Sequence, residues 1–86
     1  MTTPKRYAII KRDFPGSLLL VRTGDFYEAF HEDAVTAARI LGLVVTTRIN
    51  GKKSMPMTGF PCHSLDQYID KLKAADIRVA IVMNYE

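Results

Sequence analysis

Cysteine is nearly missing from this sequence, in which Cys62 is the single one among 86 residues. A lone cysteine excludes an internal disulfide and is typical of a reducing compartment. It also leaves no cysteine and histidine cluster that suits zinc, because His31 and His63 stand far apart in the chain. We therefore expect a cytoplasmic protein without a bound metal or cofactor.

Long apolar runs are missing as well. No stretch resembles a signal peptide and none approaches the length of a membrane span, so we expect no membrane partner. The phosphate-binding pattern Gly-x-x-x-x-Gly-Lys-[Ser/Thr] does not occur either. No linker, repeat or low-complexity segment interrupts the chain. The length of the chain predicts a single domain over residues 1–86.

The composition is that of an ordinary folded domain, 48% hydrophobic and 24% charged. The formal net charge is +3 and the pI is about 9.2. A basic bias of this size is compatible with binding to nucleic acid or to another anionic surface. It is equally compatible with a solvated surface that carries a few extra lysines, so charge alone does not select a function.

Eight secondary-structure elements are expected from the pattern of apolar residues and turn formers. Their order, α-β-β-α-β-β-α-β, predicts an α+β fold in which three helices cover a mixed sheet of about five strands. In chain order, the expected elements are a helix ending before residue 15, strands at residues 18–21 and 26–30, a helix at residues 31–41, strands at residues 43–49 and 55–58, a helix at residues 65–75 and a strand at residues 78–83.

Local signals predict how the first elements begin, pack and end. Thr3 suits the N-cap of the first helix, whose apolar face would carry Tyr7, Ile10 and Phe14. Gly42 is expected to cap the C-terminus of the second helix.

Other signals concern the second half of the chain. Asn50-Gly51 favours a hairpin turn, and residues 59–61 are expected to end the return strand. Ser64 and Gln67 fit a capping box before the last helix. The last strand contains a continuous apolar run at residues 79–82, so we expect it to be covered on both faces and central in the sheet.

The stretch Gly24-Asp25-Phe26-Tyr27-Glu28 places an aromatic ring and a carboxylate directly after a turn. Because side chains alternate along a strand, Phe26 and Glu28 share one face and Tyr27 lies on the other. If Tyr27 is buried, the ring and the carboxylate project together. Such a ring can wedge into a base step through the minor groove. The carboxylate can then meet a donor on a displaced base edge.

Two other interpretations of these residues stay open. Phe26 could belong to the core with Glu28 as a solvated neighbour, and spacing alone favours that arrangement. Asp25 and Glu28 could instead hold a metal in a nuclease, although alternation on a strand would point them to opposite sides. We expect no enzymatic activity.

A family resemblance favours the DNA-reading interpretation. Residues 18–30, with Gly-Asp-Phe-Tyr-Glu at their centre, resemble the signature of the N-terminal mismatch-recognition domain, domain I, of MutS DNA mismatch-repair proteins. Further segments resemble the family in the same order and with similar spacing, namely residues 7–11, 33–41, 46–48, 55–63, 65–72 and 79–81.

The resemblance implies a domain I-like fold and double-stranded DNA, mismatched or distorted, as the partner. It implies that Phe26 is the stacking wedge and Glu28 the base-contacting carboxylate. Arg48, Lys52 and Lys53 are candidates for phosphate contacts, because cations beside a duplex supply sequence-independent affinity. A solvated hairpin tip is an equal alternative for the two lysines.

Two departures limit what the resemblance implies. Residues 83–86 stand where the family usually has an acidic residue and Gln. The clamp, ATPase and other domains of MutS proteins are not encoded in these 86 residues, so other domains of a larger repair protein are candidate partners. The alternatives are a fragment of a larger DNA-processing protein, or a protein-interaction or scaffolding module that kept the fold without mismatch reading.

Overall fold

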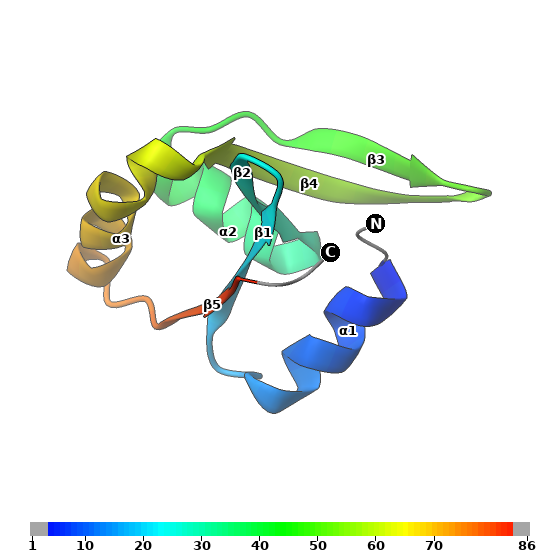
Figure 1. Ribbon diagram of the computed structural model, residues 1–86, viewed down its shortest axis with the longest axis horizontal. Coiled ribbons are helices and arrows are strands. Elements are labelled where there is room, and N and C mark those ends of the chain that lie inside the picture. The colour runs from blue at the N-terminus through cyan, green and yellow to red at the C-terminus, as the bar shows by residue number, and fades with distance from the viewer. Residues whose placement is uncertain (1–3, 84–86) are drawn as a thin grey trace.

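The computed structural model describes residues 4–83, which form three helices and a five-stranded sheet (Figure 1). The expected order of elements and the α+β fold with a mixed sheet are confirmed. The N-cap predicted at Thr3 and the departure at residues 84–86 lie outside the described residues. In chain order, the elements are α1 (Pro4–Asp13), β1 (Leu18–Thr23), β2 (Phe26–Phe30), α2 (His31–Leu41), β3 (Thr46–Asn50), β4 (Lys53–Pro61), the 3-10 turn η1 (Cys62–Ser64), α3 (Leu65–Ala74) and β5 (Val79–Val82).

The strand order in the sheet is β3-β4-β2-β1-β5. Neighbours from β3 to β1 pair antiparallel, and β5 joins β1 in parallel. The prediction that β5 is central is wrong, because β5 forms an edge. Its two faces are partly covered, since Val79 packs with one core cluster and Ala80 and Val82 pack with the other, while Ile81 is 39% exposed. An apolar run indicates covered faces and does not indicate whether both edges are paired.

Alternating strand residues build a core cluster on each face of the sheet. The helices α2 and α3 cover one cluster, and α1 covers the smaller one. The first contains Leu18, Leu20, Tyr27, Ala29, Ala34, Ala37, Leu41, Phe60 and Leu72. The second contains Tyr7, Leu19, Val21, Phe30 and Met55. The sheet is thus fixed from both sides, although one cover is a single short helix.

The ends of α1 and α2 match the sequence signals in part. Gly42 caps α2 as predicted, with φ 74° and its N–H bonded to the Ala38 carbonyl. The prediction that Phe14 lies on the apolar face of α1 is wrong, since Phe14 follows the helix and is 43% exposed. The turn after α1 carries it outward, because its N–H bonds to the Lys11 carbonyl and its carbonyl accepts from the Ser17 N–H.

The capping box predicted before α3 is not formed. Ser64 occupies the N-cap position but makes no side-chain cap hydrogen bond. The turn η1 leads straight into the helix, so that the Leu65 N–H bonds to the Cys62 carbonyl. Ser64 has φ −93° and ψ 1°, outside the extended region that a capping residue normally adopts, so its side chain is not placed to cap the helix.

The strands β3 and β4 form a long hairpin that projects beyond the rest of the sheet (Figure 1). The predicted hairpin turn is confirmed, with Asn50 paired to Lys53 and Gly51 at φ 65°. The prediction that residues 59–61 end the return strand is wrong, because β4 continues through them and they pair with β2. Pro61 is tolerated as the last residue of the strand, where a missing N–H costs little.

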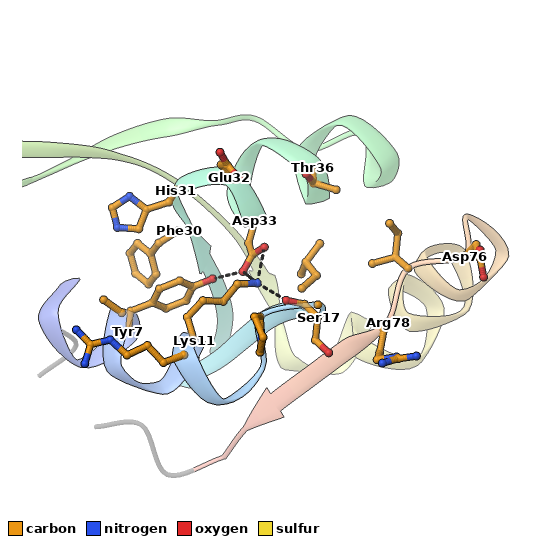
Figure 2. Close-up of a pocket in the computed structure, with 16 residues that line it drawn as sticks. Tyr7, Lys11, Ser17, Phe30, His31, Glu32, Asp33, Thr36, Asp76 and Arg78 are labelled. Atoms are coloured by element: carbon orange, nitrogen blue, oxygen red, sulfur yellow. Dashed lines mark hydrogen bonds and ion pairs between the residues drawn. The ribbon is translucent and has the colours of Figure 1, made fainter.

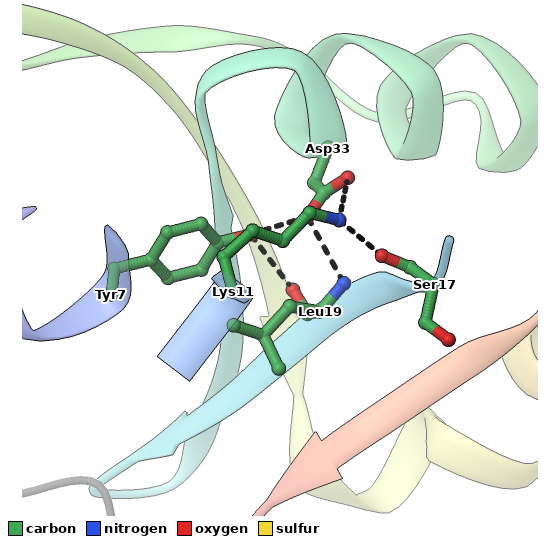
Figure 3. Close-up of polar contacts among 5 residues, drawn as sticks. All are labelled: Tyr7, Lys11, Ser17, Leu19 and Asp33. Atoms are coloured by element: carbon green, nitrogen blue, oxygen red, sulfur yellow. Dashed lines mark hydrogen bonds and ion pairs between the residues drawn. The ribbon is translucent and has the colours of Figure 1, made fainter. Parts of the chain in front are cut away.

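A carboxylate at the start of α2 ties α1 to the sheet (Figure 3). Asp33 accepts hydrogen bonds from the Tyr7 hydroxyl at 2.7 Å, the Lys11 ammonium at 2.9 Å and the Leu19 N–H at 3.1 Å. Lys11 also donates to the Ser17 carbonyl. From sequence, Asp33 is only an acidic residue that suits a helix N-terminus. In the fold it joins α1, β1 and α2.

Candidate nucleic-acid interface

The turn between β1 and β2 presents Phe26 at one end of the sheet. Gly24 has φ 62°, in the left-handed region that glycine enters at little cost, and Phe26 follows as the first residue of β2. Phe26 pairs with Thr23 on one side and with Pro61 on the other. Phe26 is 48% exposed. The interpretation of this ring as a core residue is therefore wrong.

Tyr27 anchors the same strand from the opposite face. It is only 3% exposed, and its ring centroid lies 5.9 Å from that of Phe60. The turn η1 braces the approach to the strand, because the Cys62 N–H bonds to the Asp25 carbonyl at 2.8 Å. The predicted alternation is confirmed, and the exposed ring of Phe26 stands on a well-packed support.

Glu28 does not stand free beside Phe26. Its side chain is 14% exposed, and Oε1 is buried without a hydrogen-bond partner among the described residues. Gly59 pairs opposite Glu28, and a Cβ at that position would come within 3.4 Å of Glu28 Cγ. The missing side chain of Gly59 thus leaves the space in which Glu28 lies. The carboxylate rests against the sheet instead of projecting into solvent.

Arg48 reaches Glu28 from β3, across the intervening strand β4. Its Nη1 lies 3.6 Å from Glu28 Oε1, and 30% of its side chain is exposed. The same nitrogen lies 4.0 Å from Met57 Sδ, and the guanidinium carbon lies 5.8 Å from the centroid of the Phe30 ring. A cation over an aromatic face is attracted by the ring. The structure therefore directs Arg48 toward Glu28.

Lys52 and Lys53 lie far from Phe26 and Glu28, and Arg48 lies between them on the hairpin, since Lys53 pairs with Asn50 and Arg48 with Met55. Both are exposed, Lys52 in the hairpin turn and Lys53 at the start of β4. Lys53 and Pro61, the partner of Phe26, are the two ends of the nine-residue strand β4, so the strand rise places them about 26 Å apart. The structure brings Phe26, Glu28 and Arg48 onto one face of the sheet and places the lysines at its opposite end.

A separate hollow of about 870 Å³ lies beside α1 and the start of α2 (Figure 2). Its volume is within the range of small-molecule pockets. Lys11 and Asp33, which line it, form an ion pair at 2.9 Å, and the Tyr7 hydroxyl bonds to the same carboxylate. Because these polar groups bond to one another, we assign no ligand to this hollow.

Metal ligands and membrane spans find no support in the described part of the chain. Between residues 4 and 83, no group of three or more His, Cys, Asp or Glu side chains could hold a metal ion. In the same residues, no helix has both the length and the apolar character needed to cross a bilayer. Cys62 is a free, partly buried thiol.

The sequence analysis did not predict the roles of two residues that lie against Glu28 and Arg48, namely Gly59 and Phe30. The pattern favoured a strand break at Gly59, whereas this residue allows a close approach opposite Glu28. An isolated glycine inside a strand is itself a signal of close approach, so this role could have been found. Phe30 lies beneath Arg48 through the pairing of three strands, which no local signal reports.

Comparison with known proteins identifies the family. The family described as MutS domain I matches residues 2–86. The DNA mismatch repair protein MutS of Christiangramia forsetii is 53% identical over 77 residues, which cover 90% of this chain and 9% of that protein. MutS of Cytophaga hutchinsonii is 51% identical over 78 residues, with the same coverage of 90% and 9%. MutS of Lactococcus lactis subsp. cremoris is 47% identical over 83 residues, 95% of this chain and 10% of that protein.

The chain thus spans about a tenth of the length of the curated relatives it matches. The match extends over both the β1–β2 hairpin that carries Phe26 and the β3–β4 hairpin that carries Arg48. The resemblance noted from the sequence motifs is confirmed, and the chain belongs to the MutS domain I family.

Proposed function

We propose that this chain is a DNA-binding module that recognises mismatched or distorted base pairs within a mismatch-repair protein of the MutS type. The observation that carries the proposal is Phe26, which is 48% exposed at the end of the sheet next to the buried Tyr27. A single exposed apolar residue is common, so the proposal rests on the position of Phe26 after the Gly24 turn, on the same face as Glu28 and within the segment that the MutS domain I family matches. The names of the relatives, which are DNA mismatch repair proteins, support the same function.

Phe26 acts as a wedge at a base step. The buried Tyr27 and the paired strands on both sides of β2 limit how far the ring can retreat. A rigid apolar side chain inserted from the minor groove unstacks a step and kinks the duplex. Deforming a mispaired site costs less than deforming a paired one, so the same wedge favours mismatched DNA.

Glu28 contacts the displaced base. Its Oε1 is buried and faces Arg48, so a donor on a base must meet Oε2 or rotate the carboxylate. A carboxylate is repelled by phosphates, so one that lies on the DNA-facing surface must meet a donor on a base edge. Glu28 thus adds selectivity to the wedge rather than general affinity.

The hairpin tip supplies sequence-independent affinity. Lys52 and Lys53 lie about 26 Å from the Phe26 end of β4, a span of roughly eight base pairs on B-DNA. Contacts at that distance from the mismatch position the duplex without reading it. The module is a recognition element without its own catalysis, and its further partners are the other domains of the larger repair protein.

The proposal is tested by titrating labelled homoduplex and mismatched duplex with the 86-residue chain at low salt. We expect tighter binding to the mismatched duplex, and Phe26→Ala should weaken that binding roughly fivefold or more, because a stacked base contributes about 1–3 kcal/mol. Phe14→Ala is the matched control, since Phe14 is a similarly exposed phenylalanine at 43% that follows α1. It should leave both affinities unchanged.

Equal weak binding to the two duplexes, unaffected by Phe26→Ala, would contradict mismatch reading. That outcome would favour a protein-interaction module that kept the fold. NMR shift mapping with the same duplexes would separate the two functions, because DNA reading requires perturbed amides around Phe26.

A further inference from the structure

We infer that Arg48 is a positioning residue for Glu28, holding its carboxylate on the surface that reads the base. This inference rests on the proposed function and assigns a role to Arg48 other than a phosphate contact. The two side chains come from strands that are not neighbours, yet Nη1 and Oε1 lie 3.6 Å apart. The side chain of Glu28 is mostly buried at 14% exposure, and that of Arg48 is partly buried at 30%.

The guanidinium of Arg48 also packs against side chains of the sheet other than Glu28. Phe30 and Met57 contact it from β2 and β4, so its position does not depend on Glu28 alone. A planar guanidinium stacks on an aromatic face in a way that a lysine ammonium does not. Arg48 therefore presents to Glu28 a positive charge that Phe30 and Met57 help to hold in place.

The surroundings of Glu28 favour an orientation in which its Oε1 faces Arg48. Gly59 leaves the surface beside its Cγ open, and the buried Oε1 has no hydrogen-bond donor in the described part of the chain. The cation of Arg48 is the partner that faces this oxygen. With Oε1 held inward, Oε2 is the oxygen left to accept from a base, and the positive charge offsets repulsion between Glu28 and phosphates.

A phosphate contact and a positioning role predict different results. Loss of a phosphate contact weakens binding to all duplexes equally and lowers the slope of log affinity against log salt by about 0.9. Loss of positioning lowers the ratio of mismatched to matched affinity and leaves the slope unchanged. A positioning role also couples Arg48 to Glu28. Once one of the two residues has been substituted, substituting the other has little further effect on the affinity ratio.

The test is a double-mutant cycle in the 86-residue chain with Arg48→Met, Glu28→Gln and the double variant, on matched and mismatched duplexes at several salt concentrations. We expect Arg48→Met and Glu28→Gln to lower the affinity ratio by similar factors, and the double variant to lose less than their product by at least about twofold. Lys53→Met, at the far end of the sheet, is the control and should lower the salt slope without changing the ratio. Thermal unfolding of each variant checks that the fold is retained.

Arg48→Lys keeps the charge but not the planar fork, and it should recover part of the ratio lost in Arg48→Met. No recovery in this folded variant would contradict an ionic role. Independent effects of Arg48 and Glu28, or an equal loss on both duplexes with a shallower slope, would overturn the inference alone. A wild-type chain that binds both duplexes equally would overturn the proposed function, and the inference with it.

Discussion

Two cation–carboxylate pairs join different elements of this fold, and they differ in the number of hydrogen bonds that the carboxylate accepts. Asp33 accepts from Lys11 at 2.9 Å and also bonds to a hydroxyl and a backbone N–H. Glu28 faces Arg48 at 3.6 Å, and its Oε1 has no hydrogen bond among the described residues. A carboxylate that accepts several hydrogen bonds stabilises the fold, whereas Glu28 is held by a looser pair through Oε1 and, in the proposed function, offers Oε2 to a base.

The largest effect on stability is expected for Asp33→Ala. The substitution leaves the Lys11 cation and the Leu19 N–H without their shared acceptor, which should lower the free energy of unfolding by about 3 kcal/mol. Urea denaturation measures this loss. Asp70→Ala, at an exposed position of α3, is the control and should change stability by about 0.5 kcal/mol or less. A similar value for both variants would remove the distinction between the two pairs.

A smaller loss of stability is expected for Gly59→Ala, which alters the surface against which Glu28 of the Glu28–Arg48 pair lies. The added Cβ would lie 2.9 Å from the backbone carbonyl of Tyr27 and 3.4 Å from Glu28 Cγ, so the strands must shift. We expect a loss of about 2 kcal/mol in the free energy of unfolding. Gly16→Ala is the matched control, because a Cβ added at Gly16 would meet no atom within 4 Å. Equal stability of the two alanine variants would contradict the close approach at position 59.

The smallest effect on stability is expected for Glu28→Gln. A partly exposed pair at 3.6 Å contributes little, so the free energy of unfolding should change by about 1 kcal/mol or less. Urea denaturation of Glu28→Gln and Asp33→Ala under the same conditions compares the contributions of the two pairs to stability. If Glu28→Gln cost as much as Asp33→Ala, then Glu28 would be a structural residue like Asp33.

Much of the fold could be predicted from local sequence patterns. The alternation along β2, the helix at residues 31–41 with its Gly42 cap, and the turn at Asn50-Gly51 are all observed. These features depend on backbone geometry within a few residues, which the local sequence controls. The errors fall where another element decides the outcome. β5 lies at an edge, residues 59–61 pair with β2, and the turn η1 replaces the cap expected from Ser64.

The candidate site divides in the same way. Periodicity predicted that Phe26 and Glu28 share a face opposite Tyr27, and the burial of Tyr27 agrees. Periodicity could not predict that Glu28 lies against Gly59, because strand register is set by long-range pairing. For the same reason, it could not separate Lys52 and Lys53 from the Phe26 end of the sheet.

The sequence alone determined the order of the elements and the face that Phe26 shares with Glu28, since both depend on the preferences of short stretches of chain. That the ring of Phe26 is exposed and does not belong to the core was decided by the packing around it. Tertiary structure decided which side chains meet. Arg48 and Glu28 lie on strands separated by β4, and only the packing of three strands brings their charges within 3.6 Å. Contacts across a sheet follow from register and twist, which are properties of the assembled strands.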